Sequence, residues 1–168
     1  MRTEILPGFF PKNKKWLEDI QAHLVLDDPV HIIEWPHWQT LNNSDFSVEK
    51  EVDKLIAYSK SKPFNIIAKS VGTLIAVKVL DKLRFQVQKV ILCGIPMDAL
   101  NSKDKEAYQI LAQFYKELLV IQNENDNHGS FQEAKEFLMA INSQIKIESK
   151  LRDDHEYPYF EDFQKFLE

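Results

Sequence analysis

Short apolar runs alternate along the chain with longer segments that mix apolar and polar residues. The short runs are rich in Ile, Val and Leu and are bounded by Pro, Gly or polar residues, which is typical of strands. They lie at residues 4–6, 30–35, 64–68, 87–93, 118–122 and 145–147. The longer segments repeat apolar residues every three or four positions, which predicts amphipathic helices. These lie at 13–26, from Ser47 to beyond Ile56, and at 71–83, 102–117, 131–141 and 159–167.

The order of these elements predicts the fold class. Strands that alternate with helices are joined by crossover connections, which place the strands parallel to one another. Continuous apolar runs, rather than alternating ones, indicate strands that are covered on both faces. We therefore expect an α/β protein: a three-layer sandwich with a mainly parallel sheet of about six strands and helices on both faces. Because no repeat, linker or low-complexity stretch interrupts the pattern, we expect a single domain over residues 1–168.

Composition and charge narrow the range of partners. The chain has 168 residues, of which 44% are hydrophobic and 28% charged, a balance typical of a folded protein. The net charge of −5 argues against a nucleic acid as partner, because phosphate binding needs a basic face. No apolar run approaches the roughly 20 residues that span a bilayer, and the first residues do not have the pattern of a signal peptide. We expect a cytoplasmic protein without membrane partners.

The single cysteine, Cys93, excludes an intramolecular disulfide and a cysteine-based zinc site. Cys93 lies near the end of an apolar strand, so we interpret it as a packing residue rather than a nucleophile. Ligands of parallel sheets bind at the carboxyl ends of the strands, so we expect the functional residues in the loops that follow those ends.

One such strand end carries a candidate nucleophile. The segment from Ala68 to Gly72 contains Ser70 and leads from a strand directly into a helix. This connection requires a sharp turn, with a strained residue at its apex and small residues on either side. Ser70 would then lie at a helix N-terminus, where developing negative charge is favoured. The alternative is a serine that only caps the helix.

The segment Ala68-Lys69-Ser70-Val71-Gly72 resembles the Gly-x-Ser-x-Gly nucleophile elbow of the α/β-hydrolase family, with alanine in the first position. The resemblance covers nearly the whole chain and implies a small, lidless, esterase-like member. Family members carry the nucleophile, the acid and the histidine in the order Ser, Asp, His. The order implies Asp126 as the acid, in the loop after 118–122, and His155 as the base, in the loop before the last helix.

Other residues at the same edge of the predicted sheet are also considered for a role in the site. Asp98, after the strand 87–93, is a second candidate for the acid. His128 follows Asp126 closely and is expected to be exposed rather than to act as the base. Trp35 and Trp38 lie at and just after the end of the second strand, and either line a substrate pocket or belong to the core and a stiff turn.

The resemblance also implies an oxyanion hole formed by two backbone N–H groups. One belongs to Val71, the residue after the nucleophile. The second belongs to Phe9, because the string Leu6-Pro7-Gly8-Phe9-Phe10 resembles the family's His-Gly-x turn, with Pro7 in place of histidine. Gly8 supplies the backbone freedom that such a turn requires.

These residues together predict a serine hydrolase that acts through an acyl-enzyme and needs no metal or organic cofactor. The stretch 97–117 contains only one predicted helix where larger members carry a lid, so the pocket should be open. The expected partner is a small-molecule acyl substrate, with a small or exposed carboxylic ester or thioester. The pattern does not indicate an oligomeric state. The alternatives are a catalytically silent binding protein with this fold, favoured by Ala68 and Pro7, and a peptidase or acyltransferase with the same site.

Overall fold

The computed structural model describes residues 1–59, 62–114 and 116–168. Its centre is a sheet of six strands in the order β2-β1-β3-β4-β5-β6, in which every neighbouring pair is parallel. This arrangement confirms the predicted α/β class. The strands are β1 (Thr3–Leu6), β2 (Val30–Ile32), β3 (Phe64–Lys69), β4 (Val87–Cys93), β5 (Glu117–Asn123) and β6 (Ile147–Lys150).

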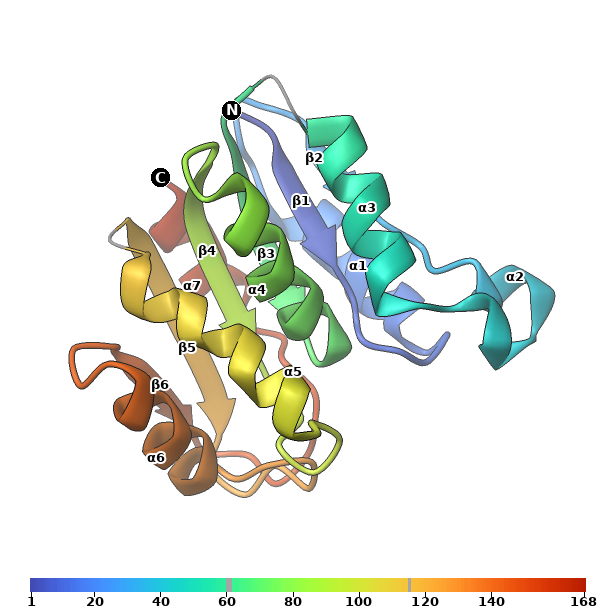
Figure 1. Cartoon of the computed structure of the whole chain (residues 1–168). Coiled ribbons are helices and arrows are strands. Elements are labelled where there is room, and N and C mark those ends of the chain that lie inside the picture. The colour runs from blue at the N-terminus through green and yellow to red at the C-terminus, as the bar shows by residue number, and fades with distance from the viewer. Residues whose placement is uncertain (60–61, 115) are drawn as a thin grey trace.

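Helices cover both faces of this sheet, as the continuous apolar strands predict (Figure 1). One face carries α3 to α6, and the other carries α1 and α7, while the short α2 projects from the edge at which β2 lies. The helices are α1 (Asn13–His23), α2 (His37–Thr40), α3 (Val48–Ser59), α4 (Val71–Leu83), α5 (Ser102–Ala107), α6 (Phe131–Ile141) and α7 (Phe160–Leu167).

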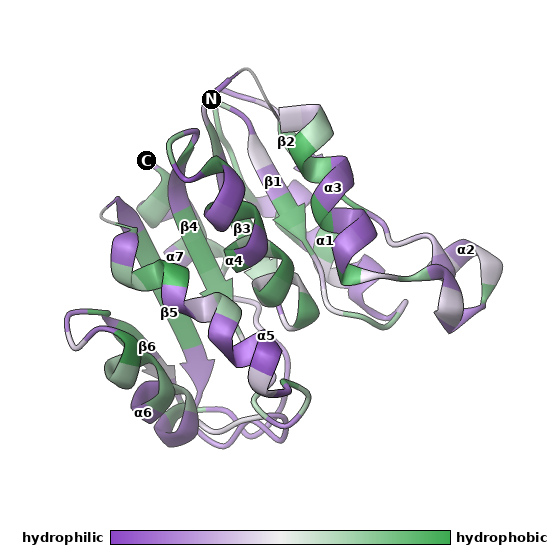
Figure 2. Ribbon diagram, in the orientation of Figure 1, coloured by the Kyte–Doolittle hydropathy of each residue, from purple (hydrophilic) through white to green (hydrophobic). Residues whose placement is uncertain are grey.

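The core lies around β3, β4 and α4. Every residue of β3 is buried, and nine of the 13 residues of α4 are buried. Figure 2 shows β4 and β5 as hydrophobic along most of their length, and β5 as hydrophilic at its carboxyl end. That end is formed by Gln122 and Asn123, which are buried polar residues. The polar ends of the strands mark the edge where loops meet.

The helix predicted over 102–117 is wrong in its second half. The α-helix ends at Ala107 and continues as a 3₁₀ helix over Tyr108–Gln113. Glu117 instead pairs with Lys89 in the sheet, so the chain must become extended before that point. Tyr108 is fully buried, and its hydroxyl lies 2.6 Å from the Thr73 hydroxyl on α4. Tyr115, which also falls in the predicted helix, lies outside the described residues.

Two edge strands also differ from the prediction. The last strand begins at Ile147 rather than at Ile145, because β6 pairs through Ile147 with Val120 and is largely exposed on the edge of the sheet. The second strand ends at Ile32 rather than at Trp35, and α2 follows from His37. Edge strands lack a continuous apolar run, so periodicity places them poorly.

Within the described part of the chain, no helix combines the length and the apolar character that crossing a membrane requires.

Candidate active site

The loops that follow the carboxyl ends of the strands come together at one edge of the sheet (Figure 1). A cavity of about 450 Å³ lies there, and loops after β1, β3, β4, β5 and β6 contribute to its wall. Its residues include Ser70 and His155, both singled out by the sequence. The rest of the wall is mostly apolar and includes Phe9, Phe10, Val71, Leu74, Pro96 and Leu100.

Ser70 stands at the apex of the turn between β3 and α4. Its backbone has φ 56° and ψ −124°, a conformation that non-glycine residues rarely adopt and that stores strain. The turn is held by hydrogen bonds from the Ser70 N–H to the Cys93 carbonyl (3.0 Å) and from the Thr73 N–H to the Ser70 carbonyl (2.8 Å). The Ser70 side chain makes no capping hydrogen bond within the described residues, so the interpretation as a simple helix cap is wrong.

The two small residues of the elbow fit it for different reasons. Gly72 lies so close to β1 that an added Cβ would approach the Leu6 carbonyl oxygen to 2.2 Å. Ala68 is fully buried inside β3, in register with Leu6 and Leu92. The Ala68 backbone is an ordinary strand, in which an L-amino acid is sterically allowed. Glycine is therefore required at position 72 and not at position 68.

Asp126 and His155 are in contact, as the order of the residues led us to expect. The Nδ1 atom of His155 lies 2.7 Å from Oδ2 of Asp126. The same oxygen accepts a hydrogen bond from the Tyr157 hydroxyl, and Oδ1 accepts one from the His128 N–H at 2.8 Å. The Asp126 side chain is completely buried, so these donors take the place of its hydration.

These contacts control the charge of the site. Burial by itself would raise the pKa of Asp126, but the hydrogen bonds from His155 and Tyr157 outweigh it and lower that pKa below its usual value. Burial raises the pKa of the Tyr157 hydroxyl, which therefore remains a donor. Asp126 is thus an anion at neutral pH, and a carboxylate on Nδ1 favours the imidazole tautomer that leaves Nε2 free to accept a proton.

The other ring nitrogen of His155, Nε2, is buried and has no hydrogen-bond partner among the described residues. His155 is only 12% exposed, and it lines the same cavity as Ser70. A buried polar atom without a partner is unusual in a folded protein, and a catalytic role is one explanation for it.

Asp98, the alternative acid, pairs with a different histidine. Its Oδ2 lies 3.0 Å from Nδ1 of His128, and both side chains line the cavity. The His128 ring packs edge-on against His155, with ring centroids 4.7 Å apart. His128 is 40% exposed, in line with the expected exposure, but its place in the wall of the cavity was not predicted. Its position two residues after Asp126, in the same loop, was the available signal.

Lys69 was also missed, although it precedes Ser70. Its side chain is 1% exposed, and its Nζ lies 2.7 Å from Oε2 of Glu156, the residue after His155. Lys12 approaches the other carboxylate oxygen of Glu156 at 3.2 Å. Burial lowers the pKa of Lys69, and the Glu156 carboxylate opposes this shift. A lysine that ends an apolar strand was the only sign in the sequence.

The two tryptophans after β2 do not line the cavity. The Trp35 indole N–H donates to the Gly8 carbonyl at 3.0 Å, and the Trp38 indole N–H donates to the Phe9 carbonyl at 2.6 Å. Both contacts support the interpretation as packing around a turn. Cys93 is fully buried, and burial raises the pKa of its thiol, which fits the interpretation as a packing residue.

No cluster of three or more His, Cys, Asp and Glu side chains is arranged to hold a metal ion within residues 1–59, 62–114 and 116–168.

Comparison with known sequences shows the family to which the chain belongs. The sequence model of the alpha/beta hydrolase domain matches residues 39–162, a stretch that contains Ser70, Asp126 and His155. The chain belongs to the alpha/beta hydrolase family. A search of curated proteins finds no significant match to the sequence.

Solved structures of other alpha/beta hydrolases are similar to this fold. Est1E from Butyrivibrio proteoclasticus, solved with ferulic acid bound, has a TM-score of 0.71 and 13% identity over 99% of this chain and 87% of its own. Mouse alpha/beta hydrolase domain-containing protein 10 has a TM-score of 0.70 and 12% identity over 99% and 87%. The meta-cleavage product hydrolase from Pseudomonas fluorescens has a TM-score of 0.69 and 10% identity over 99% and 89%. At such identities the likeness concerns the fold.

Proposed function

We propose that this alpha/beta hydrolase is a serine hydrolase that cleaves a small or exposed carboxylic ester or thioester. The observation that carries the proposal is the state of His155. Its Nδ1 is bound to a buried carboxylate, its Nε2 has no partner among the described residues, and the residue lines the same cavity as Ser70. A structural histidine has no need of a strained serine in the same cavity, whereas a general base does.

In this mechanism, His155 Nε2 takes the proton of the Ser70 hydroxyl while the oxygen attacks the acyl carbonyl. Asp126 keeps the imidazole in the required tautomer and stabilises the imidazolium. The N–H groups of Phe9 and Val71 donate to the oxyanion, an effect of roughly 3–4 kcal/mol per donor in comparable sites. The imidazolium then protonates the leaving group, and a water activated by His155 releases the acyl-enzyme.

The cavity supports a small acyl substrate. Its volume of about 450 Å³ lies at the low end of the range for small-molecule sites, and its wall is mostly apolar. Est1E, which was solved with ferulic acid bound, is an example of this fold that holds a small carboxylic acid. The net charge of −5 also favours a small molecule over a nucleic acid, and the free cysteine is compatible with the expected cytoplasmic location.

A fluorophosphonate probe, which reacts covalently with activated serines, tests the proposal. We expect the wild-type protein to be labelled, and Ser70→Ala and His155→Ala to lose the label. The matched control is His23→Ala, because His23 lies exposed on α1 and does not line the cavity. Absence of labelling in folded wild-type protein would reject catalysis and favour the alternative of a silent binding protein.

A further inference from the structure

The loop between β1 and α1 has three successive carbonyl groups, and a side chain donates to each of them. The Gly8 carbonyl accepts from the Trp35 indole, and the Phe10 carbonyl accepts from the Asn13 side-chain amide at 2.8 Å. The Phe9 carbonyl accepts from the Trp38 indole and pairs with Nε2 of His37 at 2.7 Å. These contacts hold the carbonyl groups of Gly8, Phe9 and Phe10 in fixed orientations.

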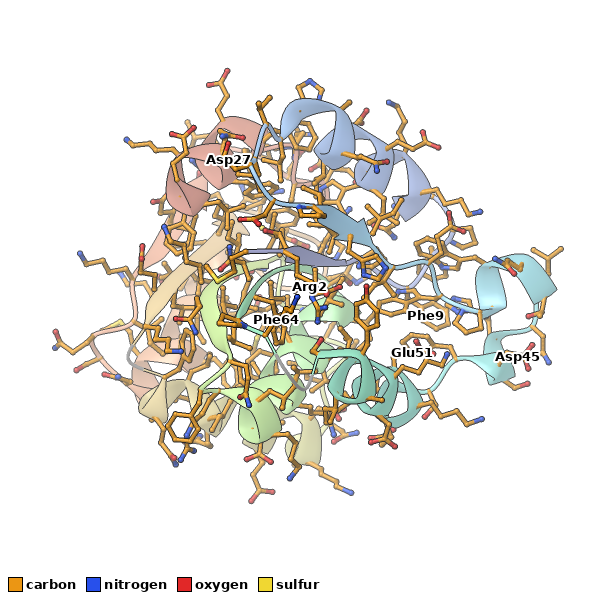
Figure 3. All side chains as sticks on the ribbon, turned by 90° about the horizontal axis from the view of Figure 1, so that it is seen from above. Arg2, Phe9, Asp27, Asp45, Glu51 and Phe64 are labelled. Atoms are coloured by element: carbon orange, nitrogen blue, oxygen red, sulfur yellow. The ribbon has the colours of Figure 1, made fainter. Side chains whose placement is uncertain are left out.

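Three of these contacts come from one segment, Trp35–Trp38, which we call the bracing segment. It begins in the connection between β2 and α2 and ends in the first turn of α2. Figure 3 labels Phe9 next to the projecting part of the chain that carries α2 and Asp45. The Phe9 ring stacks on the His37 ring, with centroids 4.3 Å apart, so backbone and side chain of Phe9 are both held.

The contact of Trp35 sets the direction of one particular N–H group. The peptide bond between Gly8 and Phe9 is trans, so its C=O and N–H point in opposite directions. Trp35, which holds the C=O, is fully buried and does not line the cavity, whereas Phe9 does. The Phe9 N–H therefore points away from Trp35, and it makes no hydrogen bond to another described residue.

We propose that Trp35 is a positioning residue that aims the Phe9 N–H at the oxyanion, with His37 and Trp38 fixing the next peptide group. This inference rests on the proposed function. Gly8 lacks a side chain and leaves its peptide free to rotate, so an external anchor is needed. Accepting a hydrogen bond at its C=O also polarises the peptide, which strengthens the N–H as a donor.

The test compares Trp35→Phe with the wild-type protein on 4-nitrophenyl acetate. The ring centroids of Trp35 and Phe46 lie 5.5 Å apart. Phenylalanine at position 35 retains an aromatic ring beside Phe46 but lacks the indole N–H. We expect kcat to fall about 10- to 100-fold, which does not exceed the fall caused by removing an oxyanion donor altogether. KM should stay within about twofold of the wild-type value. The affinity for a boronic acid, which forms a tetrahedral adduct on serine, should fall by the same factor as kcat/KM.

Two further variants keep the test decisive. Ile20→Val removes buried volume from α1 at a residue that does not line the cavity, and it should retain the wild-type kcat. Trp38→Phe is the second probe of the bracing segment should Trp35→Phe fail to fold, and it should reduce kcat with KM unchanged. A wild-type kcat in Trp35→Phe, or in Trp38→Phe if that is the folded variant, would overturn the inference, as would a rise in KM alone. Failure of the wild-type protein to turn over any acyl substrate would instead reject the proposed function.

Discussion

Gly72 illustrates how one residue can decide whether the site forms. Its α-carbon lies against the end of β1, and an added Cβ would come within 2.2 Å of the Leu6 carbonyl oxygen and 2.9 Å of the Pro7 carbonyl oxygen. Both obstacles are backbone atoms, one in the last residue of β1 and one in the first residue of the loop that leads to Phe9. A side chain at position 72 would therefore push α4 away from β1 and shift the elbow.

We expect Gly72→Ala to lower the free energy of unfolding by about 3 kcal/mol and to abolish fluorophosphonate labelling. The reason is the backbone clash, which no rotamer change relieves. Urea unfolding followed by circular dichroism measures the loss. Ala140→Gly on the exposed side of α6 is a suitable comparison, with an expected loss of about 1 kcal/mol and unchanged labelling. Equal losses in the two variants would contradict the clash.

Tyr157 is a second single residue that supports the site. Its hydroxyl donates to Asp126 and accepts from the Asn123 N–H at 3.1 Å. Tyr157→Phe leaves that N–H without an acceptor, so the free energy of unfolding should fall by about 1–2 kcal/mol. It also removes a donor that lowers the pKa of Asp126, so that pKa should rise towards its ordinary value. Urea unfolding at pH 7 measures the first effect, and Tyr58→Phe, at an exposed tyrosine, should change it by less than about 0.5 kcal/mol.

At the scale of elements, the pair of Lys69 and Glu156 joins the carboxyl end of β3 to the loop before α7. These residues flank Ser70 and His155 in the chain, so their contact at 2.7 Å ties the elbow to the histidine loop. The pair is asymmetric, because the Lys69 side chain is 1% exposed and the Glu156 side chain is 43% exposed. The two partners should therefore respond differently to substitution.

Glu156→Gln leaves a buried ammonium group without its counter-ion, and the free energy of unfolding should fall by about 1–3 kcal/mol. Lys69→Met removes the buried charge and keeps the aliphatic chain, while water can hydrate the remaining carboxylate. We expect the stability of Lys69→Met to equal or exceed that of the wild-type protein. Thermal and urea unfolding of both variants checks this; similar losses in both would show that burial of the lysine does not govern the pair.

At the scale of the whole molecule, the buried carboxylate of Asp126 links stability to pH. Its pKa is lower in the folded protein than the value of about 3.9 in an unfolded chain. Between these two values the unfolded chain binds more protons, so stability is full above about pH 4 and is lost as the pH falls through the folded pKa. The lowered pKa values of Asp154 and Glu156 act with the same sign.

We expect the melting temperature of the wild-type protein to decline as the pH falls below about 4, and that of Asp126→Asn to decline less. The variant has one carboxylate fewer with a lowered pKa, although the contributions of Asp154 and Glu156 remain. Differential scanning calorimetry across this range measures both slopes. Parallel slopes in the two proteins would mean that Asp126 does not take part in the linkage.

The elements that the sequence predicted best are those with the clearest apolar pattern. The limits of α4, β4 and α6 agree with the structure, because each carries a continuous or strictly periodic apolar pattern. The edge strand β6 was predicted at 145–147 rather than at Ile147–Lys150, and the 3₁₀ helix after α5 was predicted as part of an α-helix. In both cases the pairing or packing partner comes from a distant part of the chain, and the local pattern does not reveal it.

The sequence by itself determined the α/β class, the elbow around Ser70 and the order of Ser70, Asp126 and His155. Local periodicity carries the class and the short-range demands of a sharp turn carry the elbow, whereas the order of the three residues follows from the resemblance to the α/β-hydrolase family. Only the tertiary structure decided that His155 pairs with Asp126 rather than Asp98 and that Trp35 holds the Gly8 carbonyl, 27 residues away. Such contacts depend on how whole elements pack, and no spacing along the chain encodes the direction in which a buried side chain points.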